Sequence, residues 1–540
     1  MRRLATVLSL ASAAAALPLV GCTAADDDLY DGETVKSEDG KDDSSAVALF
    51  VDFEFDGEMV TDYAWNKQQA IEDQLLYTIG QLNGANSVGR LDRLTLSNIQ
   101  STTENGRTRI TYSAKMPVAW GDKNHVPSTF TLKLPRDMAY AALGTFATTY
   151  GHACAEAGAH DVDSGSMWYY FRPSRSGCHL TDADVLTTEA TVSPSPINTT
   201  GKFPEYDKVW EDGVLQVVAV FGKYEDGATT SSDAGISAFN SFVSSIKGEL
   251  PGATTIPASV PSSPGVATPD VEWNATLADG KQVRVVALLV DNVRNGGAAF
   301  DARYEALSTR ADLIVYNGHA GLGSNVRAMA QKGSWTAGQY VIVFQNGCDT
   351  FAYIDDALNR AHAAVNADDP IGTRYIDTVV NGMPAYFANM AGSTMALFRA
   401  LKNPADPKTY EQIFRAVSSS QVVLVTGEQD NTFTPGGGGT PTTWAGLTGD
   451  GTVTKGQEQR WETPVVAAGT YAFEMTGTKD ADLYVRIGSA PDTTHYDCRP
   501  YKTGSNETCE VTLASPSTIH VMVRGYATSS TFELAGHAVE

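Results

Sequence analysis

The amino-acid sequence predicts a multidomain chain with an α+β N-terminal domain, an α/β middle domain with a mostly parallel sheet, and an all-β C-terminal sandwich. The length of 540 residues exceeds what a single hydrophobic core supports. The middle part alternates unbroken apolar runs with helical spacing, as parallel strands covered on both faces do. The last part holds many short alternating runs and turn signals, which favour a small sandwich.

The first residues predict an exported chain. Arg2 and Arg3 precede an apolar stretch over residues 4–19, which is too short to span a bilayer comfortably. The stretch ends in Leu19-Val20-Gly21-Cys22, which resembles the lipobox of bacterial lipoproteins. This resemblance implies that residues 1–22 are a lipoprotein signal peptide and that Cys22 is the lipidated residue. The alternative is an ordinary signal peptide in which Cys22 is accidental.

Residues 23–46 predict a disordered tether between the lipid and the folded body. The segment is acidic and almost free of large apolar side chains, so it cannot offset the entropy of ordering. Thr23 stands where lipoproteins retained at the inner membrane usually have Asp, which favours the outer membrane. We therefore expect a cell-envelope protein whose membrane contact is its N-terminal lipid. No later apolar run is long enough for a transmembrane helix.

Charge and cysteine content narrow the function classes. The net charge of −24 argues against nucleic-acid binding, which needs clustered Lys and Arg. Besides Cys22, Cys498 and Cys509 flank a short loop and are a natural disulfide pair in an exported protein, and Cys154 and Cys178 are candidates for a second pair. Cys348 is left alone, and an unpaired thiol in an oxidising compartment calls for an explanation.

Residues 47–200 predict an α+β domain of unknown role. Strand patterns cover residues 47–53, 109–114 and 129–134, and residues 64–81 have helical spacing. A stretch rich in Pro, Ser, Thr and Asn near residue 200 is a plausible boundary.

Residues 201–431 predict the α/β domain. Apolar strand patterns alternate with helical spacing along the whole segment. The strands are expected at residues 214–221, 283–290, 313–316, 340–344 and 422–425, and the helices at residues 234–247, 299–308, 386–401 and 410–417. A Gly, Pro and Thr linker over residues 432–445 then leads to the sandwich at residues 446–540.

Two apolar strands of the middle domain end in chemically active residues. The first runs into Asn317-Gly318-His319, and the second into Gln345-Asn346-Gly347-Cys348. The carboxyl ends of parallel strands bind ligands in open α/β sheets. If the strands are neighbours, a His and a Cys lie side by side, which is the minimum requirement for thiol nucleophilic catalysis.

These two half-motifs resemble those of the caspase-like cysteine peptidases (clan CD), which include caspases, legumains and gingipains. The resemblance covers about residues 214–425 and implies a caspase-hemoglobinase-like fold. It makes Cys348 the nucleophile and His319 the general base or acid. Backbone N–H groups of Ala320 and Cys348 would form the oxyanion hole. Ala320 departs from the clan, which commonly has Gly directly after the His.

Structural readings of the same residues stay open. Cys348 can be a small buried residue at a strand end with His319 capping a turn, or the domain can be a decayed, inactive relative. Three acids follow the Cys and can either shape specificity for a basic side chain or act as solvated helix-start acids, and we favour the second reading. They are Asp349, Asp355 and Asp356.

The C-terminal segment resembles the bacterial pre-peptidase C-terminal (PPC) domain, an accessory sandwich of secreted peptidases. The resemblance is carried by Asp480-Ala481-Asp482-Leu483-Tyr484, by the segment around Cys498 and by Gly504-Ser505-Asn506-Glu507-Thr508-Cys509. Related sandwiches bind calcium through acidic loops, so Asp480 and Asp482 are calcium candidates, although solvated acids are the simpler reading.

A zinc site is the rival interpretation for His152, Cys154, His160, Cys178 and His179, but their spacing is irregular. The sequence has no HExxH, no nucleophile elbow and no P-loop or dinucleotide motif. We therefore expect no metal site and no required cofactor.

The sequence-based hypothesis is a lipid-anchored cysteine endopeptidase that cleaves protein or peptide substrates through an acyl-enzyme. The alternative is a non-catalytic envelope lipoprotein whose outer domains bind protein or polysaccharide, with a degenerate caspase-like scaffold.

Overall fold

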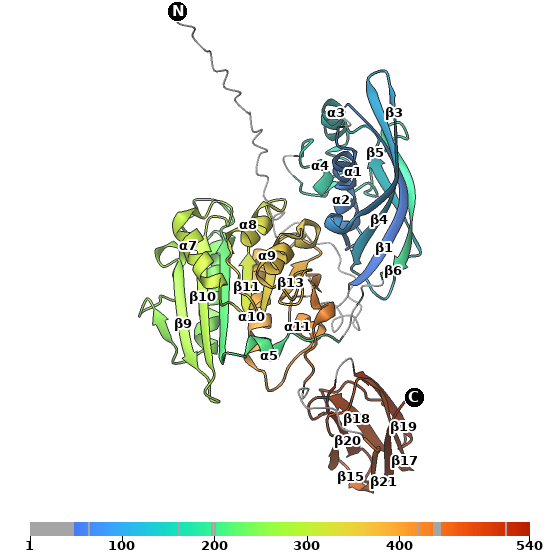
Figure 1. Cartoon of the computed structure of the whole chain (residues 1–540), viewed down its shortest axis with the longest axis vertical. Coiled ribbons are helices and arrows are strands. Elements are labelled where there is room, and N and C mark those ends of the chain that lie inside the picture. Colours follow the sequence, from blue (N-terminus) through green and yellow to red (C-terminus); the bar gives the residue numbers. More distant parts are fainter. Residues whose placement is uncertain are drawn as a thin grey trace, which may run out of the picture.

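The structure is a computed structural model that describes residues 48–62, 65–159, 162–195, 198, 201–418, 421–435, 444–513 and 516–539. The predicted signal peptide, the predicted tether and Cys22 lie outside the described residues, as does most of the predicted linker. Three parts follow one another along the chain, coloured blue to teal, green to orange, and red in Figure 1.

The N-terminal part is an antiparallel sheet in the order β2-β4-β1-β6-β5, with β3 paired to β4. Its helices lie against one face of the sheet (Figure 1). The strands are β1 (Leu49–Thr61), β2 (Val88–Gly89), β3 (Thr95–Glu104), β4 (Arg107–Trp120), β5 (Thr129–Pro135) and β6 (Val185–Pro194), and the helices are α1 (Lys67–Leu75), α2 (Tyr77–Asn83), η2 (Leu91–Arg93), α3 (Tyr140–Tyr150) and α4 (Met167–Tyr170).

The segment expected as one helix over residues 64–81 is two helices. Asn66 starts α1, because its side chain accepts a hydrogen bond from the backbone N–H of Gln69 at 3.1 Å. α1 ends at Leu75 and α2 begins at Tyr77, and every residue of α2 is buried. The expected strand at residues 47–53 also continues further, as β1 pairs with β4 up to Thr61.

The middle part is an eight-stranded sheet in the order β14-β13-β12-β11-β7-β10-β9-β8. The pairings from β13 through β12, β11 and β7 to β10 are parallel, and the outer pairings are antiparallel. The strands are β7 (Val214–Gly222), β8 (Thr254–Ile256), β9 (Asp270–Thr276), β10 (Gln282–Val290), β11 (Leu313–Asn317), β12 (Val341–Asn346), β13 (Ile376–Asn381) and β14 (Val423–Thr426).

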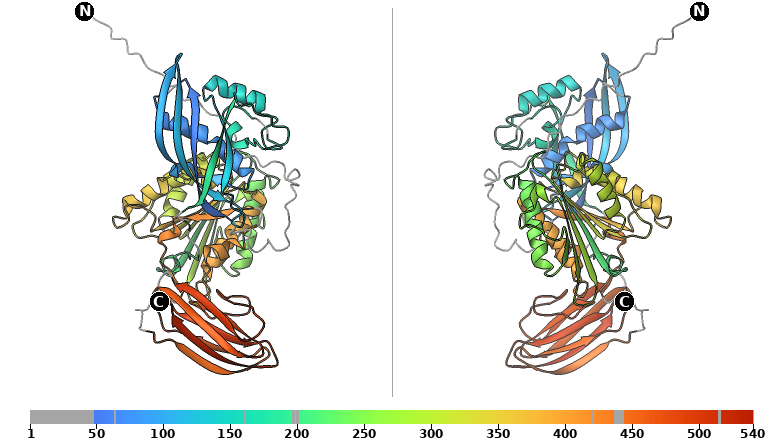
Figure 2. Two further views of the ribbon diagram at one scale, coloured as in Figure 1. Left: turned by 90° about the vertical axis from the view of Figure 1, so that its right-hand side faces the viewer. Right: turned by 90° about the vertical axis from the view of Figure 1, so that its left-hand side faces the viewer.

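Helices cover both faces of this sheet (Figure 2). Alternate residues of β7 show why: Val217 and Phe221 belong to one buried cluster, while Val218 and Val220 belong to another. The helices are α5 (Tyr206–Val209), α6 (Ala234–Glu249), η3 (Gly265–Ala267), α7 (Gly297–Ser308), α8 (Ser324–Lys332), η4 (Thr350–Tyr353), α9 (Ala357–Val365), α10 (Phe387–Lys402), α11 (Tyr410–Phe414) and η5 (Glu428–Asp430). The assignment of this domain to the caspase-like fold stays a prediction.

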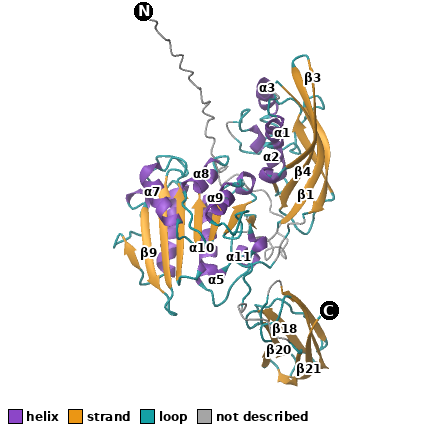
Figure 3. Ribbon diagram, in the orientation of Figure 1, coloured by secondary structure: helices purple, strands orange, loops and turns teal. Residues whose placement is uncertain are grey.

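The C-terminal part contains strands and loops, without a helix in its described residues (Figure 3). One sheet has the order β15-β21-β17-β19 and the other β16-β20-β18, and a shared core lies between them. The strands are β15 (Leu447–Thr454), β16 (Glu458–Glu462), β17 (Gly469–Thr478), β18 (Ala481–Ile487), β19 (Glu507–Leu513), β20 (Ile519–Gly525) and β21 (Ser529–Ala538). The prediction of an all-β C-terminal domain is confirmed.

A hydrophobic cluster connects the first two parts. It contains Phe53 and Trp168 of the N-terminal part together with Ala320, Cys348 and Phe351 of the middle part. The N-terminal domain is therefore packed against the carboxyl end of the middle sheet. Among the described residues, no helix is both long enough and apolar enough to cross a membrane.

Candidate functional site at the carboxyl end of the middle sheet

The two strands that end in chemically active residues are neighbours. β11 and β12 run parallel, and Asn317 lies opposite Asn346 in their register. The backbone N–H of Gly318 donates to the carbonyl of Asn346 at 3.3 Å. The turns that follow the strands, which carry His319 and Cys348, therefore leave the same edge of the sheet.

At Gly347 the two turns approach each other closely. A Cβ atom at this position would lie 2.8 Å from the carbonyl oxygen of Gly318 and 3.3 Å from the backbone nitrogen of Ala320. No side chain fits there without movement of backbone atoms. The glycine before Cys348 is thus required by the approach of one turn to the other.

Buried amides connect the ends of β11, β12 and β13. Asn346 Nδ2 donates to Asn317 Oδ1 at 2.8 Å, and Asn381 Nδ2 donates to Asn346 Oδ1 at 2.9 Å. Gln421 Nε2 also donates to Asn346 Oδ1, at 3.0 Å. Thr394 Oγ1 donates to Asn317 Oδ1 at 3.1 Å. This amide network fixes the three strand ends relative to one another, since each of these side chains is buried.

Sequence reasoning missed the amide network. A signal was present, because Asn317, Asn346 and Asn381 each end an apolar strand. Polar residues at such positions need partners, and parallel neighbours supply them.

His319 is held by its backbone and its ring. Its carbonyl accepts hydrogen bonds from Tyr316 Oη at 2.7 Å and from Asn325 Nδ2 at 2.9 Å. The ring Nε2 lies 3.0 Å from the carbonyl oxygen of Tyr224, and the ring centroid lies 5.0 Å from that of Phe387. The imidazole is therefore half-buried in an aromatic wall with a fixed orientation.

Cys348 is a free cysteine and only 7% of it is exposed. Its Sγ lies 3.7 Å from the carbonyl oxygen of Ala385. The backbone N–H groups predicted to hold an oxyanion belong to Ala320 and Cys348, which lie on these two turns, and Ala320 is fully buried. Cys348 and Ala320 are therefore both covered by neighbouring atoms in this arrangement.

Asp349 is a fully buried carboxyl at the same edge, with a left-handed backbone (φ 49°). Tyr169 Oη donates to its Oδ2 at 2.8 Å. Burial raises the pKa of Asp349 from 3.8 to about 7, although hydrogen bonds from Tyr169 and Asn83 and the charge of Arg172 oppose the rise. Asp349 thus exchanges its proton near neutral pH.

Other contacts from the N-terminal domain surround Asp349. Phe50 meets Phe351 with ring centroids 5.7 Å apart, and Trp168 meets Tyr353 at 6.5 Å. Arg90 lies over the Phe351 ring and donates to Thr426 Oγ1 at 2.9 Å. Local sequence patterns carry no signal for this cover, because each contact joins residues far apart in the chain.

The two later acids begin α9, as the simpler reading proposed. Asp355 Oδ1 accepts from the backbone N–H of Ala357 at 3.0 Å, and Asp356 pairs with Arg360 one turn later. Asp349, by contrast, points into the domain contact.

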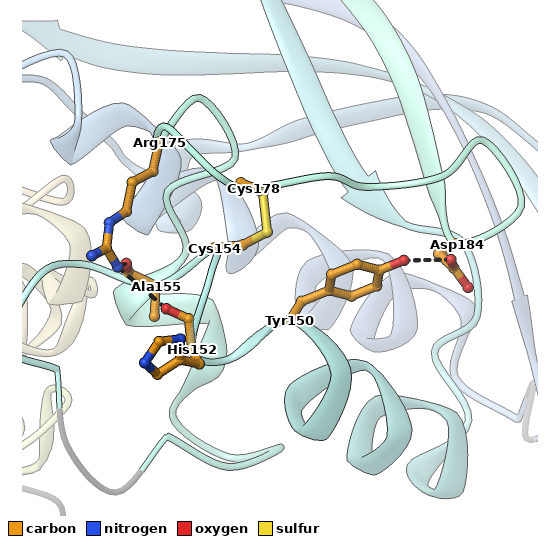
Figure 4. Close-up of a disulfide and its surroundings, with 7 residues drawn as sticks. All are labelled: Tyr150, His152, Cys154, Ala155, Arg175, Cys178 and Asp184. Atoms are coloured by element: carbon orange, nitrogen blue, oxygen red, sulfur yellow. Dashed lines mark hydrogen bonds between the residues drawn. A yellow bond between two sulfur atoms is a disulfide. The ribbon is translucent and has the colours of Figure 1, made fainter.

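Cys154 and Cys178 form a disulfide in the N-terminal domain, with Arg175 and His152 beside it (Figure 4). Cys498 and Cys509 form the second disulfide. The first disulfide removes two of the five residues in the zinc alternative. His160 lies outside the described residues.

The calcium candidates of the C-terminal domain have protein partners. Asp480 Oδ1 accepts from the backbone N–H of Gly504 at 2.9 Å, and Asp482 Oδ2 accepts from Arg499 Nη2 at 2.9 Å. The described residues contain no group of three or more His, Cys, Asp or Glu side chains placed to hold a metal ion.

Comparison with known proteins identifies the C-terminal domain. Residues 462–525 match the family model described as the bacterial pre-peptidase C-terminal domain, so the chain carries a PPC domain. A neutral protease of Vibrio proteolyticus is 59% identical over 51 residues, which cover 9% of this chain and 8% of the relative. A zinc metalloprotease of Helicobacter pylori is 42% identical over 77 residues, or 14% of this chain and 30% of the relative.

Two further matches have the same limited extent. The alkaline serine exoprotease A of Vibrio alginolyticus is 48% identical over 54 residues, or 10% of each chain. The solution structure named vEP C-ter 100 is 42% identical and covers 15% of this chain and 83% of its own, with a TM-score of 0.14. The chain spans less than a third of the length of each of these three protease relatives.

These relatives contradict the sequence-based function. The relatives are a metalloprotease and a serine exoprotease, whereas a cysteine peptidase was expected, so the caspase-like cysteine peptidase hypothesis is wrong. The alternative of a non-catalytic lipoprotein is not favoured either, because the relatives are proteases. A His and a Cys at strand ends misled the prediction, since the same residue types also fill buried turns.

The expectation that no cofactor is required is also wrong by this comparison, because a zinc metalloprotease uses zinc. The side chains present do not fit that ion, however. In the part of the chain that the structure describes, no three candidate ligands come together, whereas zinc sites have three or four protein ligands. We therefore assign no reaction step of this chain to zinc.

Proposed function

We propose that the chain is an exported protease that acts on protein substrates and carries its PPC domain as an accessory module. The match of residues 462–525 to the PPC family model carries the proposal, together with protease relatives that are 42–59% identical over their matched segments. Two disulfides support export to an oxidising compartment.

We place the substrate-binding site of this protease at the carboxyl edge of the middle sheet. Parallel sheets bind ligands at this edge. His319 and Cys348 lie there on two turns whose preceding strands the amide network fixes. Gly347 allows the two turns to approach each other. The proposal assigns these residues to the site and leaves the chemical class of the protease to experiment.

The first experiment tests the activity and its class. The chain without residues 1–22 is incubated with fluorescein-labelled casein at pH 6 and pH 8, and product is measured by fluorescence. We expect the chain to hydrolyse casein. Inhibition by 1,10-phenanthroline would identify a metalloprotease, and inhibition by a serine-directed fluorophosphonate would identify a serine protease. Hydrolysis that neither reagent abolishes would exclude both classes. Metal content of the purified chain by mass spectrometry checks the chelator result. A chain that leaves casein intact at both pH values overturns the proposal.

The second experiment tests the location of the site. His319→Ala is expected to lower kcat/KM by about 100-fold or more if the imidazole contacts the reacting groups. His125→Ala is the matched control, since the His125 side chain is 82% exposed on the N-terminal domain. Equal activity of the wild-type chain and His319→Ala would remove the carboxyl edge as the site.

A further inference from the structure

One turn of the middle domain makes several of the contacts with the N-terminal domain. Tyr169 donates to Asp349, and Phe50 packs against Phe351. Arg90 lies over the Phe351 ring and also donates to Thr426 at the end of β14. This turn directly follows Cys348, which lies two residues after the end of β12. The N-terminal domain thus sits on the part of the middle sheet where parallel sheets bind ligands.

The groups that act on Asp349 come from the N-terminal domain. Tyr169 donates to its carboxylate, and Asn83 contributes a further hydrogen bond. The charged side chains nearby are Arg172 and Glu156, which pair with each other at 2.7 Å. Because Arg172 is engaged by Glu156, the carboxylate of Asp349 has no ion pair of its own among the described residues.

We propose that the N-terminal domain is a pH-sensitive cap, which closes the carboxyl edge of the middle sheet by burying Asp349 and is released as the pH rises. If the chain is the proposed protease, the cap would keep it inactive while closed, and only this consequence rests on the proposed function. The cap itself is a property of the domain contact.

The direction of the pH effect follows from the burial. Burial raises the pKa of Asp349 from 3.8 to about 7, so the buried carboxyl keeps its proton where an exposed one has lost it. Between pH 4 and pH 7 the capped form binds more protons, and opening becomes easier as the pH rises, by at most about tenfold per pH unit. Above pH 7 both forms are ionised and the effect levels off.

Cys348 provides a reporter that needs no activity. It is the free thiol of the described residues and lies beside Asp349. In the chain that lacks residues 1–22, the rate of its alkylation by iodoacetamide can be followed by mass spectrometry from pH 5 to pH 9. Asp349→Asn is the reference, because an amide has the same shape and does not titrate, and dividing by its rate removes the intrinsic titration of the thiol.

We expect the ratio of wild-type to Asp349→Asn rates to rise several-fold or more between pH 5 and pH 7 and to level off above. Tyr169→Ala should label about tenfold faster than wild type at pH 5.5, since a hydrogen bond and packing of the cap are lost. Tyr140→Ala is the matched control on the same domain, because Tyr140 is 82% exposed. Circular dichroism establishes that each variant is folded.

If the ratio of wild-type to Asp349→Asn labelling rates is the same at every pH, the pH sensitivity is overturned. If Cys348 in Tyr169→Ala is labelled as slowly as in the wild type, the cap is overturned. Casein hydrolysis is measured on the same samples. A rising ratio without hydrolysis supports the cap and refutes the proposed protease, whereas hydrolysis with a flat ratio does the reverse.

Discussion

The side-chain amide of Asn346 donates a hydrogen bond to the side-chain oxygen of Asn317 at 2.8 Å, which ties the end of β12 to the end of β11. The Asn346 oxygen also accepts hydrogen bonds from Asn381 and Gln421. One side chain therefore serves three partners in a region without water-exposed alternatives, because all four residues are fully buried.

Asn346→Ala should destabilise the middle domain by about 3 kcal/mol, since buried amides lose their partners. Chemical denaturation followed by fluorescence measures the change. Asn295→Ala is the control, because Asn295 is exposed in the same domain. Equal denaturation midpoints for the two variants would show that the amide network contributes little to stability.

Gly347→Ala should be destabilising by about 1–3 kcal/mol, because its Cβ would lie 2.8 Å from the carbonyl oxygen of Gly318. Gly392→Ala is the matched substitution within α10, where the new Cβ has open space and helix propensity improves. The two melting temperatures should move in opposite directions. A neutral Gly347→Ala would mean that the two turns separate easily.

How far the sequence predicted this molecule depends on the range of the interaction. The apolar strands that became β7, β10, β11 and β12 were readable because both faces of a parallel sheet are covered, and their carboxyl ends identified His319 and Cys348 as neighbours. The antiparallel strand β9, which lies between β10 and the edge strand β8, was missed. Its alternating burial is interrupted by Glu272, a buried carboxylate that pairs with Arg284 and Arg303.

Local sequence patterns could not predict the contact between the N-terminal domain and the middle domain. Tyr169 and Asp349 are 180 residues apart, and neither position differs in type from ordinary surface or helix-start residues. The prediction of the protease class was wrong for another reason, because a His and a Cys beside parallel strand ends do not specify a chemistry. The PPC domain, by contrast, could be predicted from its own residues.

Asp377 should make the middle domain less stable as the pH rises from about 4 to about 6. Burial raises its pKa from 3.8 to about 6, so the folded state binds more protons than the unfolded state over this interval. Its Oδ2 accepts from Tyr340, Tyr410 and Asn431, so Asp377→Asn can keep these bonds through its remaining oxygen.

The stability difference between wild type and Asp377→Asn should therefore change by about 3 kcal/mol between pH 4 and pH 7 in favour of the variant. Thermal unfolding at several pH values measures it. A pH-independent difference would show that the carboxyl is ionised in both states.

His362 should have the opposite effect. The residue is 1% exposed and its ring packs beside Trp335, and burial lowers its pKa from 6.5 to about 4. The folded state binds fewer protons than the unfolded state between these values, so stability falls as the pH drops from about 6.5 to about 4. His362→Leu should raise the melting temperature at pH 5 more than at pH 7.5. Equal increments at both pH values would contradict a buried neutral imidazole.

The disulfide between Cys154 and Cys178 should hold the cap in place as well as stabilise its domain. The loop that it closes carries α4, and with it Tyr169 and Trp168, the side chains that meet Asp349 and Tyr353. Replacing both cysteines by Ala removes about 3 kcal/mol of loop-closure stabilisation. It should also speed alkylation of Cys348, because α4 is less restrained. The double Ala variant of Cys498 and Cys509 is the matched control, since that disulfide joins the loop after β18 to β19 of the C-terminal sandwich. Equal labelling rates in the two double variants would mean that α4 keeps its place on Asp349 through packing alone.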